Sequence, residues 1–315
     1  MIKYIEHKDI DFIKWDNCIK NSLNNIVYAY SWYLNIVTEN NWDAYVLDDY
    51  EAVMPLPVRN KFGIRYLYQP LFTQQLGVFS TTDNQLNINA FITETIKDFK
   101  FAEYNFNVKN TFDSSSANVL KNLNLELDLK RSYKDILSGY SQNHKRNLKK
   151  AKENRIVTAF NTDFQAIISL FRQGKGNEIK AFNNKSYLIL EKLLTSLSEK
   201  NMLCCIGSYN ENSDKLIAGI IFLKHNNRQI FLFSGNNKIA KEVGAMYLLA
   251  DSFIEQSCET TKTLDFEGSN NENLARFYRG FGSKEKYYFS LRHNNLPSVT
   301  KRFLYFYKKL KKFIS

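Results

Sequence analysis

The sequence has little of the residue types that staple small folds or bind metals. It contains 4 Cys, 4 Pro and 4 His in 315 residues. The cysteines are Cys18, Cys204, Cys205 and Cys258. No two of them are spaced as Cys-x-x-Cys and the histidines are scattered, so neither a disulfide framework nor a zinc site has the spacing it needs. We expect reduced thiols and no metal.

Long hydrophobic runs are also missing. No run reaches the roughly 18 residues that suggest a membrane span. The first residues, Met1–Asp9, interleave charged and apolar side chains and do not form the apolar region of a signal peptide. We therefore expect a soluble, cytoplasmic protein. With 44% hydrophobic and 15% aromatic residues in a chain of this length, the composition favours two globular domains over disorder.

Acidic residues are nearly absent from two segments. From His144 to Arg155 there are six Lys or Arg and one acid, Glu153, and from Lys301 to Ser315 there are six and no acid. These two segments account for the whole net charge of +11. They predict an anionic partner such as tRNA, a nucleotide-linked precursor or an anionic membrane face. Alternatively, each is a solvated face of the protein.

Residues 217–292 have the clearest succession of strands and helices. Ile217–Leu223 is a nearly continuous apolar run and Gln229–Phe233 is a second β-rich run after turn residues, which predicts a hairpin. A loop over 235–242 then leads to a helix that starts at Gly244. A glycine at a helix start lets the backbone approach a ligand closely, and the free N–H groups there favour an anion.

The end of this region predicts a short strand, a short helix and a final strand. Their ranges are Thr263–Gly268, Asn271–Gly280 and Tyr287–Arg292. Upstream, further helices are predicted over 12–19, 31–37 (with Ser31 as its cap), 86–99, 134–140, 163–171 and 186–198. Further strands are predicted over 42–47, 52–58, 102–108, 123–129 and 204–209.

Two motifs in this order resemble the acyl-CoA N-acyltransferase (GNAT) family. They are Lys241-x-x-Gly244-Ala245 at the helix start and Asn271-x₆-Tyr278-x₃-Gly282 further on. The stretches 140–151 and 264–282 look like its FemAB branch. Members of that branch carry two tandem GNAT-like domains and add amino acids to peptidoglycan precursors from aminoacyl-tRNA.

The resemblance implies an α/β (α+β) fold of two tandem GNAT-like domains. Each would be a mixed, mostly antiparallel sheet flanked by helices. On this basis we expect an N-terminal domain over residues 1–130, a donor-binding domain over 131–295 and a basic amphipathic helix over 296–315. That last helix could lie on an anionic membrane surface, peripheral to the inner membrane face, or cap the protein's own core.

The function implied is an N-acyltransferase that moves an acyl or aminoacyl group from a thioester, acyl-CoA, to an amine acceptor such as a cell-wall precursor. Two alternatives stay open. The donor could be aminoacyl-tRNA, for which the basic helix would be essential. The chain could instead be a catalytically inactive GNAT-like module that holds RNA or a membrane, with Phe231 and Phe233 filling the donor gap.

The resemblance also assigns a donor site. In GNAT-like proteins a splayed gap between strands accepts the donor, and the loop before the helix binds its pyrophosphate. Lys241 and the N–H groups around it at the helix start would supply that anion site. The donor-binding residues expected here are Phe233, Ser234, Lys241, Val243, Gly244, Ala245, Met246 and Asn271.

Two residues are candidates for proton transfer. Tyr278 falls where the family commonly has a tyrosine acid, and a pKa near 10 suits protonation of a thiolate. FemAB members that use tRNA often have lysine there, so Tyr278 favours a thioester donor; alternatively it is a packed aromatic. Because Asp265 and Glu267 alternate on one strand face, Glu267 is the candidate base, unless it fixes the following loop and the amine proton leaves through water.

Acceptor contacts are expected at two places. Residues 64–78 combine aromatic side chains with amides, as a small-molecule pocket requires, which points to Tyr68, Gln74 and Gln75; an ordinary strand with a polar loop is the alternative. On the basic helix, Lys145, Lys149 and Lys152 fall at i, i+4 and i+7 and share one face. The resemblance places this helix near the substrate, and Lys145, Arg146 and Lys149 are its predicted contacts.

Overall fold

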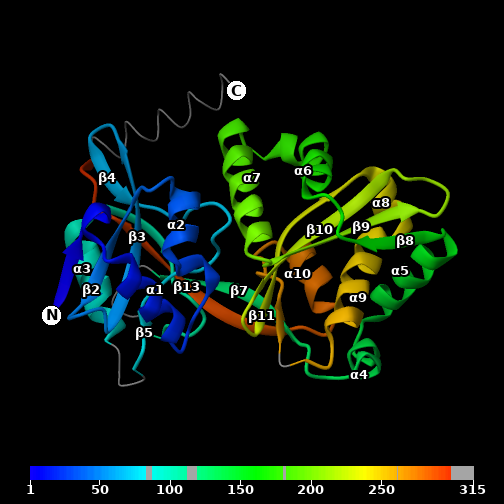
Figure 1. Ribbon diagram of the computed structural model, residues 1–315, viewed down its shortest axis with the longest axis horizontal. Helices are drawn as coiled ribbons and strands as arrows, with labels where there is room; N and C mark the ends of the chain where they lie inside the picture. The colour runs from blue at the N-terminus through cyan, green and yellow to red at the C-terminus, as the bar shows by residue number, and fades with distance from the viewer. Residues whose placement is uncertain (83–86, 112–118, 180–181, 261, 299–315) are drawn as a thin grey trace. The chain divides into compact units, whose positions relative to one another are not determined.

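The computed structural model describes residues 1–82, 87–111, 119–179, 182–260 and 262–298. The chain divides into two compact units, which we call unit 1 (Met1–Lys121 with Tyr288–Ser315) and unit 2 (Asn122–Tyr287). Both are mixed α/β, with mostly antiparallel strands (Figure 1). The basic helix predicted over 296–315 lies outside the described residues from 299 onward. Among the described residues, no helix has both the length and the apolar character required to cross a membrane.

Unit 1 begins with a strand and two helices before its sheet continues. Its elements are β1 Ile2–Ile5, α1 Phe12–Asn21, α2 Ser31–Thr38, β2 Trp42–Leu47, β3 Ala52–Lys61, β4 Ile64–Leu67, β5 Phe79–Ser80, α3 Ile88–Asp98, β6 Phe101–Asn105 and the end of β13, Lys284–Asn294. The strand order is β1-β2-β3-β4-β6-β13, with β5 on β3. All these pairs are antiparallel except β4 with β6.

The opening helices of unit 1 are held by buried aromatic side chains. Trp15 packs against Trp42 with ring centroids 4.9 Å apart, and its Nε1 donates to the Ala29 carbonyl at 2.9 Å. Ser31 does not cap α2, contrary to the sequence prediction. It is the first helical residue, and its hydroxyl donates to the Asp16 carboxylate at 2.7 Å, which ties α2 to α1.

Unit 2 is built around an antiparallel sheet with one parallel pair at its centre. Its elements are β7 Val119–Asp128, α4 Tyr133–Ser138, α5 Gln142–Glu153, β8 Ile156–Phe160, α6 Phe164–Gln173, α7 Asn184–Glu199, β9 Leu203–Asn210, β10 Leu216–His225, β11 Arg228–Asn236, α8 Lys238–Val243, α9 Ala245–Ser257, β12 Thr263–Asp265 and α10 Glu272–Arg279. The strand order is β7-β12-β11-β10-β9-β8, and only β11 with β12 is parallel.

Helices cover both faces of the unit 2 sheet. On one face, a Cβ at Gly219 would lie 2.5 Å from the Ile167 side chain, and a Cβ at Gly235 would lie 2.5 Å from the Ile167 carbonyl. Both glycines therefore let α6 approach the sheet to backbone-contact distance. On the other face, Phe222 of β10 stacks on Phe253 of α9 at a centroid distance of 3.5 Å.

The structure confirms the predicted hairpin and the predicted helix after Gly244. It also confirms the predicted helices that precede and follow them in the sequence. The loop expected over 235–242 is wrong, because β11 continues to Asn236 and 238–243 forms α8. The Asn237 side chain accepts from the Ala240 N–H and caps the start of α8, and Gly244 ends it in the left-handed region at φ 76°.

Candidate active site

The two parallel strands at the centre of unit 2 separate soon after they pair. The register joins Arg228 with Thr263 and ends at Ile230 with Asp265. β12 stops there, whereas β11 runs on to Asn236. Ligands of α/β sheets bind beyond the carboxyl ends of parallel strands, where neighbours diverge. We call the place where the pairing ends the strand gap; it is where the family resemblance predicts a donor.

A β-bulge lies on the β11 side of the strand gap. Phe231 pairs with Phe222 and Phe233 pairs with Ile221, so the register with β10 skips Leu232. In a regular strand, residues two apart face the same way. The extra residue reverses this: Phe231 packs near Phe266 and Tyr278, whereas Phe233 packs against Phe171 of α6. Bulges of this kind re-aim side chains next to active sites.

Tyr278 of α10 lies in the aromatic cluster at this gap. Its ring stacks on Phe266 at 4.9 Å and meets Phe231 edge-on at 5.7 Å. The residue is 6% exposed, yet its hydroxyl makes no hydrogen bond among the described residues. Burial raises the pKa of Tyr278 above its ordinary value, and the nearby charge of Glu267 raises it further. The phenol therefore stays protonated and holds an unused donor.

Glu267 lies two residues after the end of β12 at Asp265. Its φ of 57° lies in the left-handed region, which is uncommon for a residue other than glycine. Its N–H donates to the Asp265 carboxylate at 2.8 Å, which holds the turn. The predicted alternation of side chains along the strand holds for Leu264 and Phe266, which lie in the core, and for Asp265, which lies on the other side. Glu267 does not continue this alternation. The turn brings it near Tyr278.

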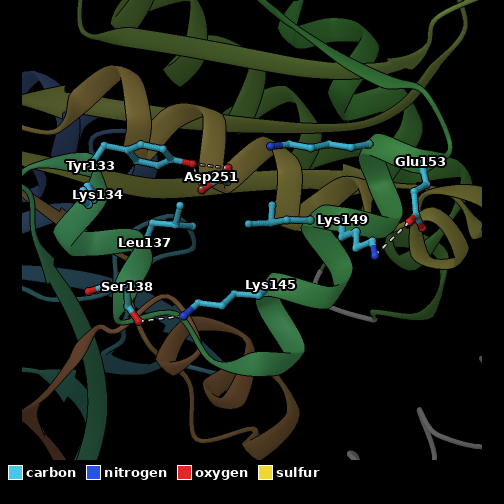
Figure 2. A pocket seen from close by; sticks show the side chains of 10 residues that line it. Tyr133, Lys134, Leu137, Ser138, Lys145, Lys149, Glu153 and Asp251 are labelled. Atoms are coloured by element: carbon cyan, nitrogen blue, oxygen red, sulfur yellow. Dashed lines mark hydrogen bonds and ion pairs between the residues drawn. The ribbon is translucent and has the colours of Figure 1, made fainter.

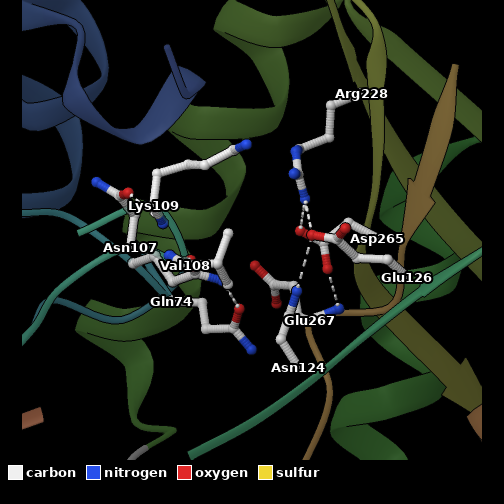
Figure 3. A network of polar contacts seen from close by, with 10 residues as sticks. Gln74, Asn107, Val108, Lys109, Asn124, Glu126, Arg228, Asp265 and Glu267 are labelled. Atoms are coloured by element: carbon white, nitrogen blue, oxygen red, sulfur yellow. Dashed lines mark hydrogen bonds and ion pairs between the residues drawn. The ribbon is translucent and has the colours of Figure 1, made fainter. Parts of the chain in front are cut away.

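An ion-pair network anchors the end of β12. The Arg228 guanidinium contacts Asp265 and pairs with Glu126 of β7 at 2.9 Å (Figure 3). Asp265 is buried; burial raises its pKa, and the positive charge of Arg228 opposes that rise. The Asn124 amide donates to Glu126 at 3.4 Å, while its Oδ1 is buried without a hydrogen-bond partner among the described residues. The network fixes the turn that carries Glu267.

The predicted anion site at the start of α9 is largely closed. Ala245 has no exposed surface, and a Cβ at Gly244 would lie 2.7 Å from the Asn147 carbonyl of α5. Val243 and Met246 are half-buried, and Lys241 is exposed on α8. Because Ala245 is covered, its N–H is not open to a pyrophosphate in solution.

The remaining predicted donor residues have structural surroundings. Asn271 is the N-cap of α10, and its side chain accepts from the N–H groups of Asn273 and Leu274. Phe233 faces α6, as described above, and Ser234 is half-buried in β11 opposite Ile220.

The basic helix α5 lines a separate pocket. It has a volume of about 580 Å³ and is lined by residues of α4, α5 and α9 (Figure 2). Lys145 and Lys149 both line it, as their shared helix face predicts. Arg146 is exposed but is not among the residues that line it.

The predicted acceptor residues of unit 1 make internal contacts. The Arg59 guanidinium lies 3.9 Å above the Tyr68 ring. Gln75 is buried; its Oε1 accepts from the Val108 N–H at 2.9 Å, and its amide donates to Gln74 at 2.7 Å. These bonds fix a loop, so the amide of Gln75 has a structural use.

Sequence reasoning missed Arg228, Lys134 and Asp251. The signal for Asp251 is a lone acid inside the otherwise apolar run of α9. Arg228 opens a strand whose parallel neighbour carries acids, but that pairing appears only in the fold. Lys134 belongs to a helix that was predicted without a role.

Comparison with solved structures finds similar folds. FemX superimposes with a TM-score of 0.60 and 9% identity, covering 93% of this chain and 98% of that one. L-PGS from Bacillus licheniformis gives 0.54 and 10%, covering 91% and 94%. The C-terminal domain of a putative lysylphosphatidylglycerol synthetase from Agrobacterium fabrum gives 0.55 and 8%, covering 89% and 90%.

The chain has a GNAT-like, FemAB-type fold. Comparisons with protein-family models and with curated protein sequences gave no match. In this FemAB-type fold, the strand gap and its bulge belong to unit 2, which also contains Tyr278 and Glu267.

Proposed function

We propose that the chain transfers an acyl or aminoacyl group to an amine acceptor, and that unit 2 holds the donor in the strand gap. The observation that carries the proposal is the hydroxyl of Tyr278. The Tyr278 side chain is 6% exposed beside the gap, its hydroxyl makes no hydrogen bond among the described residues, and the charge of nearby Glu267 raises its pKa further after burial. Such a hydroxyl is able to donate to a ligand.

The chemistry needs one proton acceptor and one proton donor. The amine nitrogen attacks the donor carbonyl and forms a C–N bond, while the bond from the carbonyl carbon to the leaving oxygen or sulfur breaks. Glu267 accepts the proton that the attacking nitrogen loses. Tyr278 donates its proton to the leaving atom, and transfer from Glu267 restores both residues. In this proposal, backbone N–H groups at the bulge of β11 polarise the carbonyl.

Two features favour an oxygen ester such as aminoacyl-tRNA over acyl-CoA as the donor. The raised pKa of Tyr278 is better matched to a basic alkoxide than to a thiolate. The burial of Ala245 removes one of the N–H groups that would bind the pyrophosphate of CoA. One of the structural neighbours is named as part of a putative lysylphosphatidylglycerol synthetase, which supports an aminoacyl group as cargo.

The acceptor we propose is an amine on a cell-wall precursor. The FemAB-type fold supports it, and Tyr68, whose ring lies beneath the Arg59 guanidinium, is the unit 1 contact that we propose. If such a precursor is membrane-linked, the basic segment after residue 298 would serve as a peripheral contact with the anionic surface.

The test is a transfer assay with the purified full chain. Radiolabelled aminoacyl-tRNA and acetyl-CoA are each supplied with a panel of amine acceptors, including cell-wall precursor peptides. We expect amide product from aminoacyl-tRNA, with Tyr278→Phe slowing it about 100-fold, within the range typical of a lost general acid.

The matched control is Tyr187→Phe. The Tyr187 hydroxyl on α7 is also buried without a partner among the described residues, but Arg172, not a carboxylate, lies over its ring. Its rate should stay within about twofold of wild type, an allowance for indirect effects. Equal rates for Tyr278→Phe and wild type would overturn the roles assigned here. Binding of a donor without any transfer would favour the inactive module.

A further inference from the structure

The pocket on α5 lies apart from the strand gap. Its lining residues are Tyr133, Lys134, Leu137, Ser138, Lys145, Leu148, Lys149, Lys152, Glu153 and Asp251, all from α4, α5 and α9. None comes from β11, β12 or α10, which form the gap. Its volume of about 580 Å³ falls within the roughly 300–1,000 Å³ of small-molecule sites.

Positive charge surrounds the pocket and is only partly neutralised. Lys149 is 3.7 Å from Glu153, but both side chains are exposed, so this pair is weak. The ammonium of Lys145 donates to the Ser138 carbonyl at 3.0 Å, which positions it without cancelling its charge. Lys134 and Lys152 have no ion-pair partner among the described residues. Four ammonium groups therefore face two acids.

The inner wall of the pocket differs from its rim. Asp251 is 3% exposed, and both of its carboxylate oxygens accept from the Tyr133 hydroxyl, at 3.1 and 3.0 Å (Figure 2). Burial raises the pKa of the Tyr140 hydroxyl, and the charge of nearby Asp251 raises it further. A carboxylate has about four acceptor sites, so Asp251 can accept further donors.

Apolar side chains also line the pocket. Leu148 of α5 is buried at the pocket and Leu137 of α4 is partly buried beside it. The ring of Tyr133 and the stems of the lysines add to this apolar surface. A molecule that fills the pocket thus meets ammonium groups, apolar side chains and a hydrogen-bond acceptor.

We propose that this pocket binds a small phosphorylated molecule of the nucleoside monophosphate class. The lysines contact the phosphate, Leu137 and Leu148 contact the apolar faces of the base, and Asp251 accepts from a ring or exocyclic N–H. Binding of a nucleic acid backbone requires only the lysines. The buried acid Asp251 and the apolar side chains favour a small ligand that enters the pocket. The proposal is independent of the acyl-transfer reaction.

Isothermal titration of the full chain with AMP, CMP and UMP tests it, with adenosine and inorganic phosphate as partial ligands. We expect at least one nucleotide to bind with a submillimolar dissociation constant and adenosine to bind at least about tenfold more weakly, the equivalent of about 1.4 kcal/mol. Lys145→Met with Lys149→Met should weaken nucleotide binding at least tenfold.

Two variants make the result specific to the pocket. Lys150→Met with Lys192→Met removes the same charge from exposed positions that do not line it, and should leave affinity within about twofold, since distant surface charges are screened. Asp251→Asn should weaken nucleotide binding but leave phosphate binding unchanged. Equal losses in both double variants, or no nucleotide binding at 5 mM (about ten times the expected constant), would overturn the proposal. So would binding of an RNA hairpin that nucleotides fail to displace.

Discussion

Unit 1 and unit 2 use their buried polar groups differently. In unit 1, the Gln75 amide donates to Gln74 and the Gln75 carbonyl oxygen accepts from the Val108 N–H. The sequence had predicted that Gln75 contacts a ligand. In unit 2, the Oδ1 of Asn124 is buried without a hydrogen-bond partner, and the hydroxyl of the largely buried Tyr278 makes no hydrogen bond among the described residues. An unmade buried hydrogen bond costs about 1–3 kcal/mol. Such groups indicate where a ligand supplies the missing hydrogen bond, which favours unit 2 as the location of the ligand site.

The largest expected effect is a loss of stability when Arg228 of unit 2 is replaced. Replacement by Met leaves the buried carboxylate of Asp265 and the half-buried carboxylate of Glu126 without their counter-charge, and should lower the free energy of unfolding by about 3–5 kcal/mol. Urea denaturation measures it. Arg276→Met, at an exposed position of α10, is the control and should change little. An unchanged midpoint for Arg228→Met would show that the network does not anchor β12.

A smaller effect is expected at Gln75. Gln75→Leu keeps the volume but leaves the Val108 N–H without its acceptor, which should cost about 1–3 kcal/mol. The transfer rate per folded molecule should stay the same, because no polar group of Gln75 remains free for a substrate. Thermal unfolding and the transfer assay, run on the same preparation, separate the two readouts. If Gln75→Leu is stable but transfers slowly, the prediction is wrong and Gln75 contributes to the acceptor site.

The smallest effect concerns His144, a unit 2 residue whose hydrogen bonds are all made. Its Nδ1 lies 2.9 Å from the Ser141 hydroxyl and its Nε2 lies 2.8 Å from the Phe277 carbonyl, so α5 is tied to α10. Burial lowers its pKa, and the bond to Phe277 opposes this. The neutral form is thus favoured in the folded state.

The sign of the pH dependence follows from that shift. The unfolded chain takes up the proton first as pH falls, so the stabilisation present above about pH 6.5 is lost below it, at no more than about 1.4 kcal/mol per pH unit. Unfolding temperatures between pH 7.5 and 5.5 should fall, and less steeply in His144→Gln. Because burial also lowers the pKa of His225, His225→Gln is the companion variant. A slope unaffected by His144→Gln would contradict this assignment.

Local patterns in the sequence predicted much of the fold. The apolar runs Ile217–Leu223 and Gln229–Phe233, with turn residues between them, specify the hairpin that organises unit 2. The spacing of lysines on α5 placed Lys145 and Lys149 on one face, as found. Strand β8 was missed because Ile156–Phe160 is a short strand at the end of the sheet, half of which faces solvent.

The geometry of the site depends on packing that a single sequence does not reveal. The bulge at Leu232 arises from the register of β11 against β10. It is the reason that the side chains of Phe231 and Phe233 point in different directions. The closure of the α9 start depends on the approach of Asn147 to Gly244. Asn271, which the family motif marks for the donor, acts in the fold as a helix cap.

Hydrogen exchange of β11 tests the central claim most directly. The full chain is incubated with an RNA minihelix that carries an amino acid through a stable amide, and separately with CoA, and the peptide 228–236 is followed by mass spectrometry. The account predicts slower exchange in this peptide with the aminoacyl RNA, because the donor carbonyl occupies the N–H groups of the bulge. Unchanged exchange in β11, with protection confined to unit 1, would contradict it.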